Sequence, residues 1–251
     1  STEDAKLLED LYESFKANGA TLNKDDKEKY RKLSMDLSML TLQFDQNALK
    51  DKNRFELLIT DENELSGLPE SARDAAAMLA KSKDKNGWLF NLSAPSYIPF
   101  MRYSDKRDLR EKMYREYMSV GNKGDEFDNK DIIKKIVNIR LEIAQLMGFK
   151  NYAEYALEHT MAKNSANVYK LLNQLLEAYK PIAINEYNAV EGFALGTEKE
   201  NITVMPWDWS YYSEKLRDIR FKVNDEMTRP YFELSNVKTV SYTHLTLPTI
   251  L

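Results

Sequence analysis

Apolar side chains recur every three or four residues along most of the chain, which is the spacing of one face of an α-helix. The clearest stripe lies between residues 30 and 48 and predicts a single helix of about seven turns. A helix of this length with one apolar face must pack against another element. The stripe consists of Tyr30, Leu33, Leu37, Leu40, Phe44 and Ala48.

Two further stripes predict long helices in the second half of the chain. The first follows Asp128 and Asn129, either of which can cap a helix start, and it ends before Gly148, which suits a helix C-terminus. The second begins near Ser165, and Pro181, which lacks an amide hydrogen, is predicted to kink or end that helix. The first stripe is Ile132, Ile136, Ile139, Ile143 and Leu146, and the second is Val168, Leu171, Leu172, Leu175, Leu176 and Tyr179.

Weaker helical patterns and two short strands complete the predicted elements. Residues 55–60 and 88–92 are rich in aromatic and branched side chains, which predicts strands that are placed to pair with each other. The predicted fold class is therefore mainly α, with one minor pair of short strands. The weaker helical patterns cover residues 5–16, 69–81, 105–119, 152–161 and 208–221.

Composition and charge exclude several classes of protein. The 251 residues are 43% hydrophobic, enough for a core, and contain no cysteine, so neither disulfides nor thiolate metal sites are expected. The 36 basic and 40 acidic residues are interleaved, which leaves no basic face for a nucleic acid. No apolar run approaches the roughly 20 residues of a membrane span, so no membrane association is expected.

The absence of cysteine also fits a reducing compartment, and we expect a cytoplasmic protein. The first residues, Ser1 to Asp4, have neither the basic start nor the apolar stretch of a signal peptide. Because the sequence does not begin with Met, we expect the natural N-terminus to lie upstream. A secreted or periplasmic protein therefore stays open as the alternative.

The last residues differ in character from the rest of the chain. Residues 240–249 read V-S-Y-T-H-L-T-L-P-T, which resembles one reading frame of a transposase adapter used to prepare sequencing libraries. The alternative is a genuine edge strand, since Tyr242, Thr243 and Thr246 are good strand formers. The specific match favours the adapter, so we predict that residues 239–251 are an artefact tail and that the native sequence is cut near Lys238.

The histidine content argues against a complete zinc site in this chain. A catalytic zinc ion needs about three protein ligands, and a helical His-Glu-x-x-His motif supplies two imidazoles one turn apart. With His244 assigned to the tail, His159 is the only histidine, and Glu158–Ala162 contains no second imidazole. We therefore predict no catalytic, cofactor-binding or metal-binding residues here. His159 shares a helical face with Tyr152 and Tyr155, and is predicted to point inward or to end its helix.

The segment from Pro206 to Tyr212 has the most unusual local composition, with four aromatic residues and one carboxylate. Asp208 is placed to cap the start of a helix, with Tyr211 and Tyr212 in the first turn. Exposed aromatic side chains would suit a peptide-binding groove, whereas buried ones would belong to the core. We predict core packing combined with capping.

Seven blocks of this sequence resemble the thimet oligopeptidase and peptidyl-dipeptidase family of zinc metallopeptidases, and bacterial peptidyl-dipeptidase in particular. Their order and spacing agree with that family over residues 1–238, which correspond to well under half of a family member. The blocks are L-S-G-L-P-E-S-A at 65–72, G-W-L-F-N-L-S-A-P-S-Y-I-P-F-M at 87–101, L-R-E-K-M-Y-R-E-Y at 109–117, A-Q-L-M-G-F-K-N-Y-A-E at 144–154, M-A-K at 161–163, P-W-D-W-S-Y-Y-S-E-K-L-R at 206–217 and R-P-Y-F-E-L at 229–234.

The resemblance implies a mostly helical, two-lobed peptidase with a deep channel that admits short unfolded peptides. It implies release of C-terminal dipeptides, whereas the oligopeptidase relatives cut internally. In that family a His-Glu-x-x-His motif and a further Glu bind zinc, and the motif glutamate is the general base. These residues lie downstream of the point where this chain ends. Residues 1–238 are therefore expected to form a helical, non-catalytic channel wall that is inactive without the missing C-terminal catalytic half.

Two alternatives to the peptidase are a non-enzymatic scaffold and a metal-free hydrolase. A non-enzymatic helical scaffold would use the long amphipathic stripes to bind a partner protein. A metal-free hydrolase would need paired carboxylates at a suitable spacing, and no such spacing is evident. Sequence beyond Lys238 separates the scaffold from the peptidase, since only the peptidase predicts a downstream His-Glu-x-x-His.

Overall fold

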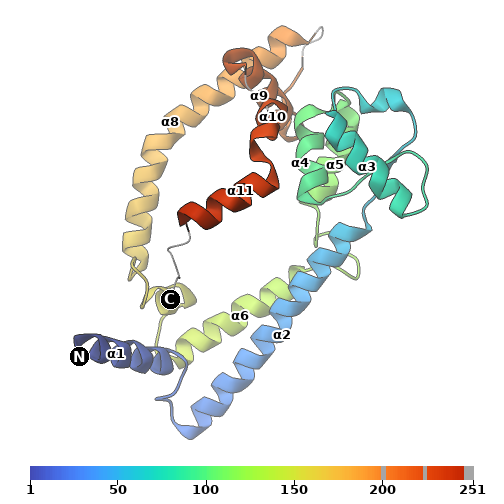
Figure 1. Ribbon diagram of the computed structural model, residues 1–251. Coiled ribbons are helices and arrows are strands. Elements are labelled where there is room, and N and C mark those ends of the chain that lie inside the picture. Colours follow the sequence, from blue (N-terminus) through green and yellow to red (C-terminus); the bar gives the residue numbers. More distant parts are fainter. Residues whose placement is uncertain (199–201, 223–224, 246–251) are drawn as a thin grey trace.

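The computed structural model describes residues 1–198, 202–222 and 225–245, and it is mainly α-helical with one pair of short strands, as predicted (Figure 1). The helices are α1 (Thr2–Ala17), α2 (Lys24–Arg54), α3 (Glu70–Ser82), α4 (Ala94–Tyr103), α5 (Arg107–Met118), α6 (Lys130–Leu146), α7 (Tyr152–Leu157), α8 (Ser165–Thr197), α9 (Pro206–Phe221), α10 (Asp225–Thr228) and α11 (Leu234–Val240); the strands are β1 (Leu57–Ile59) and β2 (Trp88–Phe90); short 3₁₀ turns cover Glu62–Leu65 and Arg229–Phe232, and a π-helical turn covers Ser241–Leu245.

The long helix predicted from the first stripe is α2, and its partner is α6, the helix predicted from the second stripe (Figure 1). Asn23 caps α2, because its side chain accepts a hydrogen bond from the backbone N–H of Asp26 at 2.9 Å. Leu33 of α2 and Ile136 of α6 are both buried. The two stripes are therefore complementary, and each removes the other's apolar face from water.

The main core lies at the C-terminal end of α2, where the strands and helices α3 to α5 gather (Figure 1). β1 and β2 pair antiparallel, with Leu57 opposite Phe90 and Ile59 opposite Trp88, which confirms the predicted strand pair. α3 packs on β2, and α4 and α5 pack on α9. The buried core residues are Leu57, Ile59, Leu65, Leu68, Ala76, Phe90, Leu92, Phe100, Met101, Met113 and Trp207.

Helix α4 was not predicted, because its sequence contains two prolines that usually oppose a helix. Pro95 occupies the first turn, where no intrahelical N–H is needed, so it is compatible with a helix start. Pro99 lies inside the helix and costs one backbone hydrogen bond. Burial of the adjacent Phe100 and Met101 offsets that loss.

Helix α8 runs continuously through Pro181, so of the two predicted effects of this proline, a kink or an end, the end is wrong and the kink stays a prediction. Figure 1 shows α8 as a long bowed helix that meets α7 at one end and α9 at the other. Within the described residues the buried side chains of α8 are Val190 and Ala194 near its C-terminus, and they pack against Tyr211 and Tyr212 of α9. None of the helices in residues 1–198, 202–222 and 225–245 has the length and apolar character required to cross a membrane.

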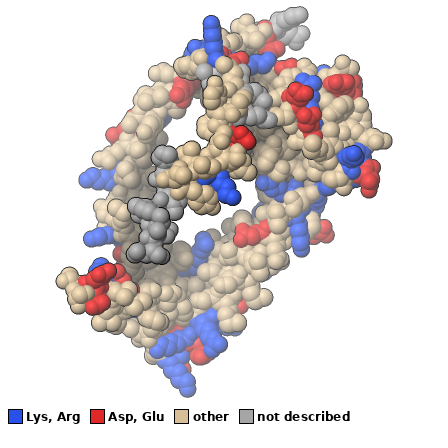
Figure 2. Space-filling model, in the orientation of Figure 1, with Lys and Arg blue, Asp and Glu red and all other residues tan. Residues whose placement is uncertain are grey.

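The predicted apolar stripe of α8 is therefore real as a pattern but lacks a partner among the described residues. In the view of Figures 1 and 2 an opening borders α8, and α11 lies between α8 and the pair formed by α2 and α6. A continuous run of exposed apolar side chains along one helix is typical of an interface. Its exposed side chains are Tyr169, Leu171, Leu172, Leu175, Leu176, Tyr179 and Ile182.

Candidate functional site

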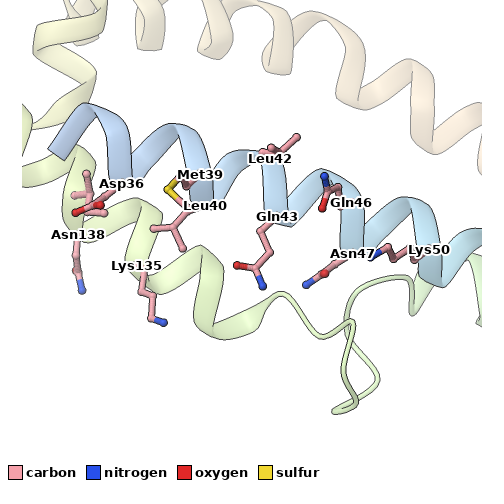
Figure 3. Close-up of a pocket in the computed structure, with 11 residues that line it drawn as sticks. Asp36, Met39, Leu40, Leu42, Gln43, Gln46, Asn47, Lys50, Lys135 and Asn138 are labelled. Carbon is pink, nitrogen blue, oxygen red and sulfur yellow. The ribbon is translucent and has the colours of Figure 1, made fainter. Parts of the chain in front are cut away.

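A groove along the seam between α2 and α6 is the candidate binding site, and we call it the α2/α6 groove (Figure 3). Its volume is about 760 Å³, which is within the range of small-ligand pockets. α2 supplies most of the lining, and α6 supplies one wall. The lining residues are Asp36, Met39, Leu40, Leu42, Gln43, Gln46, Asn47, Lys50, Lys135, Asn138 and Ile139.

The groove combines apolar side chains with amides and a few charges. Gln43 and Gln46 make no hydrogen bond within the described residues, so their donors and acceptors are available to a ligand. Asn47 differs, because its Nδ2 donates to Oδ1 of Asn129 at 3.1 Å. Asn129 in turn donates to the backbone carbonyl of Phe44 at 3.1 Å, which fixes the start of α6 against α2.

A buried carboxylate stabilises one end of this helix pair. Asp51 is fully buried and accepts hydrogen bonds from the backbone N–H of Gly121 at 2.7 Å and from Arg54 Nε at 2.7 Å. Lys123 Nζ also lies 3.2 Å from its carboxylate. Gly121 has a φ of +70°, which favours glycine at this turn. These contacts hold the loop before α6 against α2 and keep the groove in shape.

The side chain of His159, the one histidine outside the predicted tail, is exposed, so the predicted inward orientation is wrong, whereas the alternative role in ending its helix stays a prediction. Helix α7 ends at Leu157, earlier than predicted, and the three- and four-residue periodicity no longer applies at His159. Its exposed imidazole Nε2 lies 3.4 Å from the carboxylate of Glu158. Tyr155 is the inward residue instead, and its hydroxyl donates to the backbone carbonyl of Ala17 at 2.7 Å.

Within residues 1–198, 202–222 and 225–245 no three His, Cys, Asp or Glu side chains are grouped so that they could hold a metal ion. His244 belongs to the predicted tail, and the prediction that residues 239–251 are foreign stays a prediction. The described part of that tail continues helically from α11 up to Leu245.

The aromatic segment at the start of α9 belongs to the core, which confirms the predicted packing. Trp207, Tyr211 and Tyr212 are buried, whereas Trp209 is 37% exposed and stacks on Tyr187 with ring centroids 5.8 Å apart. The capping prediction is wrong in register, because the N-cap residue of α9 is Met205. Asp208 is the third helical residue, and its carboxylate accepts the backbone N–H of Met205 at 3.1 Å.

Asp208 also forms a buried ion cluster that sequence reasoning missed. Arg107 Nη2 lies 2.7 Å from its carboxylate, and Arg110 Nη2 lies 2.8 Å away. Arg110 is only 1% exposed, and its guanidinium stacks over the ring of Tyr211 at 4.0 Å. The arginines lie one turn apart on α5, but nothing in the sequence indicates that α9 supplies their acid. The cluster joins α5 to α9 and has a structural role.

The family and the relatives to which this chain is similar all carry the names of peptidases. The profile of peptidase family M3 matches residues 100–247. Oligopeptidase A of Haemophilus influenzae is 37% identical over 243 residues, which are 94% of this chain and 35% of that protein. The probable cytosolic oligopeptidase A of Arabidopsis thaliana is 36% identical over 92% of this chain and 34% of its own length. The dipeptidyl carboxypeptidase of Escherichia coli is 29% identical over 94% of this chain and 35% of its own length. The chain thus spans about a third of the length of these relatives.

Proposed function

Because the chain belongs to peptidase family M3, we propose that the whole protein is a zinc-dependent peptidase that hydrolyses short unfolded peptides. The observation that carries the proposal is the family match over residues 100–247. Relatives named oligopeptidase A and dipeptidyl carboxypeptidase, each similar over 94% of this chain, support it. In this proposal residues 1–238 form a wall of the substrate channel.

We place the zinc ligands outside these 251 residues. A zinc ion that activates water needs about three protein ligands and one open position. His159 stands alone, and no suitable group of His, Cys, Asp or Glu occurs within the described ranges. The residues present therefore do not fit a zinc site, and we assign no catalytic step to them.

The reaction products define the finer part of the proposal. We propose release of dipeptides from the C-terminus, the activity named in the dipeptidyl carboxypeptidase relative. Internal cleavage is the second candidate, favoured by the higher identity to oligopeptidase A, 37% against 29%. A peptide with a blocked C-terminal amide separates them, because internal cleavage tolerates the block and release of an unmodified C-terminal dipeptide does not.

The decisive experiment extends the coding sequence past Lys238 and tests the complete protein. We expect a downstream His-Glu-x-x-His motif, and peptide cleavage that a chelator abolishes and added zinc restores. The 251-residue chain alone is expected to be inactive in the same assay. A gene that continues without a paired-histidine helix would favour the non-enzymatic scaffold. Tight stoichiometric zinc and cleavage by the chain alone would also contradict the proposal.

A second expectation concerns the exposed apolar stripe of α8. If this stripe packs against the rest of a larger protein, the isolated chain should aggregate or bind a hydrophobic dye such as anilinonaphthalene sulfonate. Replacing Leu172 and Leu176 with glutamate should reduce dye fluorescence, because both side chains belong to the stripe. Replacing Met78 of α3, which is 72% exposed, is the matched control and should change it little. A monodisperse chain that binds no dye would count against a missing partner half.

A further inference from the structure

Two asparagines of this chain, Asn18 and Asn86, are followed directly by a glycine. In such a pair the backbone nitrogen of the glycine can attack the side-chain amide carbon of the asparagine, because glycine has no Cβ to obstruct the approach. The reaction requires that the asparagine side chain and the glycine N–H are both free to move. The two pairs differ in this respect, although the reacting residues are the same.

The pair formed by Asn18 and Gly19 is held at the C-terminal end of α1. The Nδ2 of Asn18 donates a hydrogen bond to the backbone carbonyl of Ser14 at 2.8 Å. Gly19 is buried, and its backbone N–H donates to the carbonyl of Lys16 at 3.0 Å. Both reacting groups are therefore engaged, and an attack requires these hydrogen bonds to open first.

The pair formed by Asn86 and Gly87 lies in the bend between α3 and β2 and is free. Asn86 is exposed, and within the described residues neither its side chain nor the Gly87 N–H makes a hydrogen bond. Gly87 has a φ of +114°, and a Cβ at this position would lie 2.3 Å from the backbone carbonyl oxygen of Ile59. The close approach of the two strands therefore requires glycine here, and this requirement keeps Asn86 in a reactive sequence context.

We propose that Asn86 is a site of spontaneous deamidation in the folded protein and that Asn18 is protected from it. The Gly87 nitrogen forms a bond to Cγ of Asn86 and gives up its proton, while the Cγ–Nδ2 bond breaks, so that ammonia leaves and a succinimide ring remains. Water then opens the ring at either carbonyl, which leaves aspartate or isoaspartate at this position. Water is the only co-reactant, and nothing is oxidised or reduced.

The products would alter the entry into β2. Isoaspartate lengthens the main chain by a methylene group directly before Trp88, which pairs with Ile59. Either product also adds a negative charge next to Lys85, whose ammonium group pairs with Glu56. Both changes act at the edge of the main core, in which Phe90 of β2 is buried. Deamidation is therefore expected to loosen the pairing of β1 with β2.

The test incubates the 251-residue chain in mildly alkaline buffer at physiological temperature. Samples are digested with pepsin in acid, where the succinimide forms slowly, and mass spectrometry locates each exchange of an amide for an acid. Asn86 should convert faster than Asn18 by about ten-fold or more, because the hydrogen bonds at Asn18 and Gly19 must open before reaction. In urea that unfolds the chain, the two rates should become similar. Electron-transfer fragmentation should detect isoaspartate beside aspartate.

Two controls accompany this measurement. The Asn86→Ser variant should show no conversion at this position, and after the same incubation it should keep the melting temperature of the fresh variant, whereas that of the unmodified chain should fall. Asn91 is the internal control and should stay intact, because Leu92 follows it and its Oδ1 accepts the backbone N–H of Ser93 at 3.0 Å.

Equal rates at Asn86 and Asn18 in the folded chain, or a ratio that urea leaves unchanged, would overturn the inference. An incubated chain that contains isoaspartate and melts like the fresh chain would overturn the expected loosening of the strand pair. Because no peptide is cleaved in this experiment, its outcome is independent of the proposed function.

Discussion

Replacing Asp208 with alanine should lower the free energy of unfolding by about 3–5 kcal/mol, as expected when one partner of a buried ion pair is removed. The carboxylate is fully buried and accepts hydrogen bonds from both Arg107 and Arg110. Without it the guanidinium of Arg110, only 1% exposed, would be left without its counter-ion. The Met205 N–H would also lose its acceptor at the start of α9. Urea denaturation followed by circular dichroism measures the change.

The matched control is Asp218→Ala, since Asp218 lies on the same helix but is exposed. It should change stability by less than about 0.5 kcal/mol. A loss for Asp208→Ala no larger than for this control would show that the buried cluster does not stabilise the fold.

The same carboxylate should contribute to the pH dependence of stability. Burial alone would raise the pKa of Asp208, but hydrogen bonds from Arg107, the Met205 N–H and Arg110 outweigh it and lower the pKa. Because the folded pKa is lower than the unfolded one, the stabilisation is present above the unfolded value of about 4 and is lost as the pH falls through the folded value. The Asp208→Asn variant should lack this contribution, so its stability should fall less steeply in acid.

The helices that could be predicted are those in which periodicity and burial agree. Leu33 of α2 and Ile132, Ile136 and Ile143 of α6 repeat at helical spacing and are buried where the two helices meet. The strand pair was also predictable, because short runs of branched and aromatic residues favour extended structure over a helix. In α8 the pattern predicted the helix but not its environment. An apolar stripe indicates that a helix packs against another surface, but it does not identify that surface.

The features that could not be predicted depend on contacts between residues far apart in the chain. Arg110 and Asp208 are 98 positions apart, and only the packing of α5 on α9 brings them together. The α2/α6 groove likewise exists only where side chains of two helices leave space between them. The inward orientation predicted for His159 was wrong for a local reason, because α7 ends at Leu157 and helical spacing does not extend to residue 159. Local patterns thus predicted elements, whereas sites required the tertiary arrangement.

Replacing Phe100 with alanine should destabilise the chain by about 3–5 kcal/mol, the range measured when a large aromatic side chain is removed from a core. Phe100 is fully buried, and its ring meets that of Phe90 edge to face, with centroids 4.8 Å apart. The same substitution of Ile98, which is on α4 but 45% exposed, should cost about 1 kcal/mol or less and controls for helix propensity. Thermal and urea denaturation of both variants measure the difference. Equal losses would mean that α4 is not anchored by the core, and that its position between β2 and α9 needs another explanation.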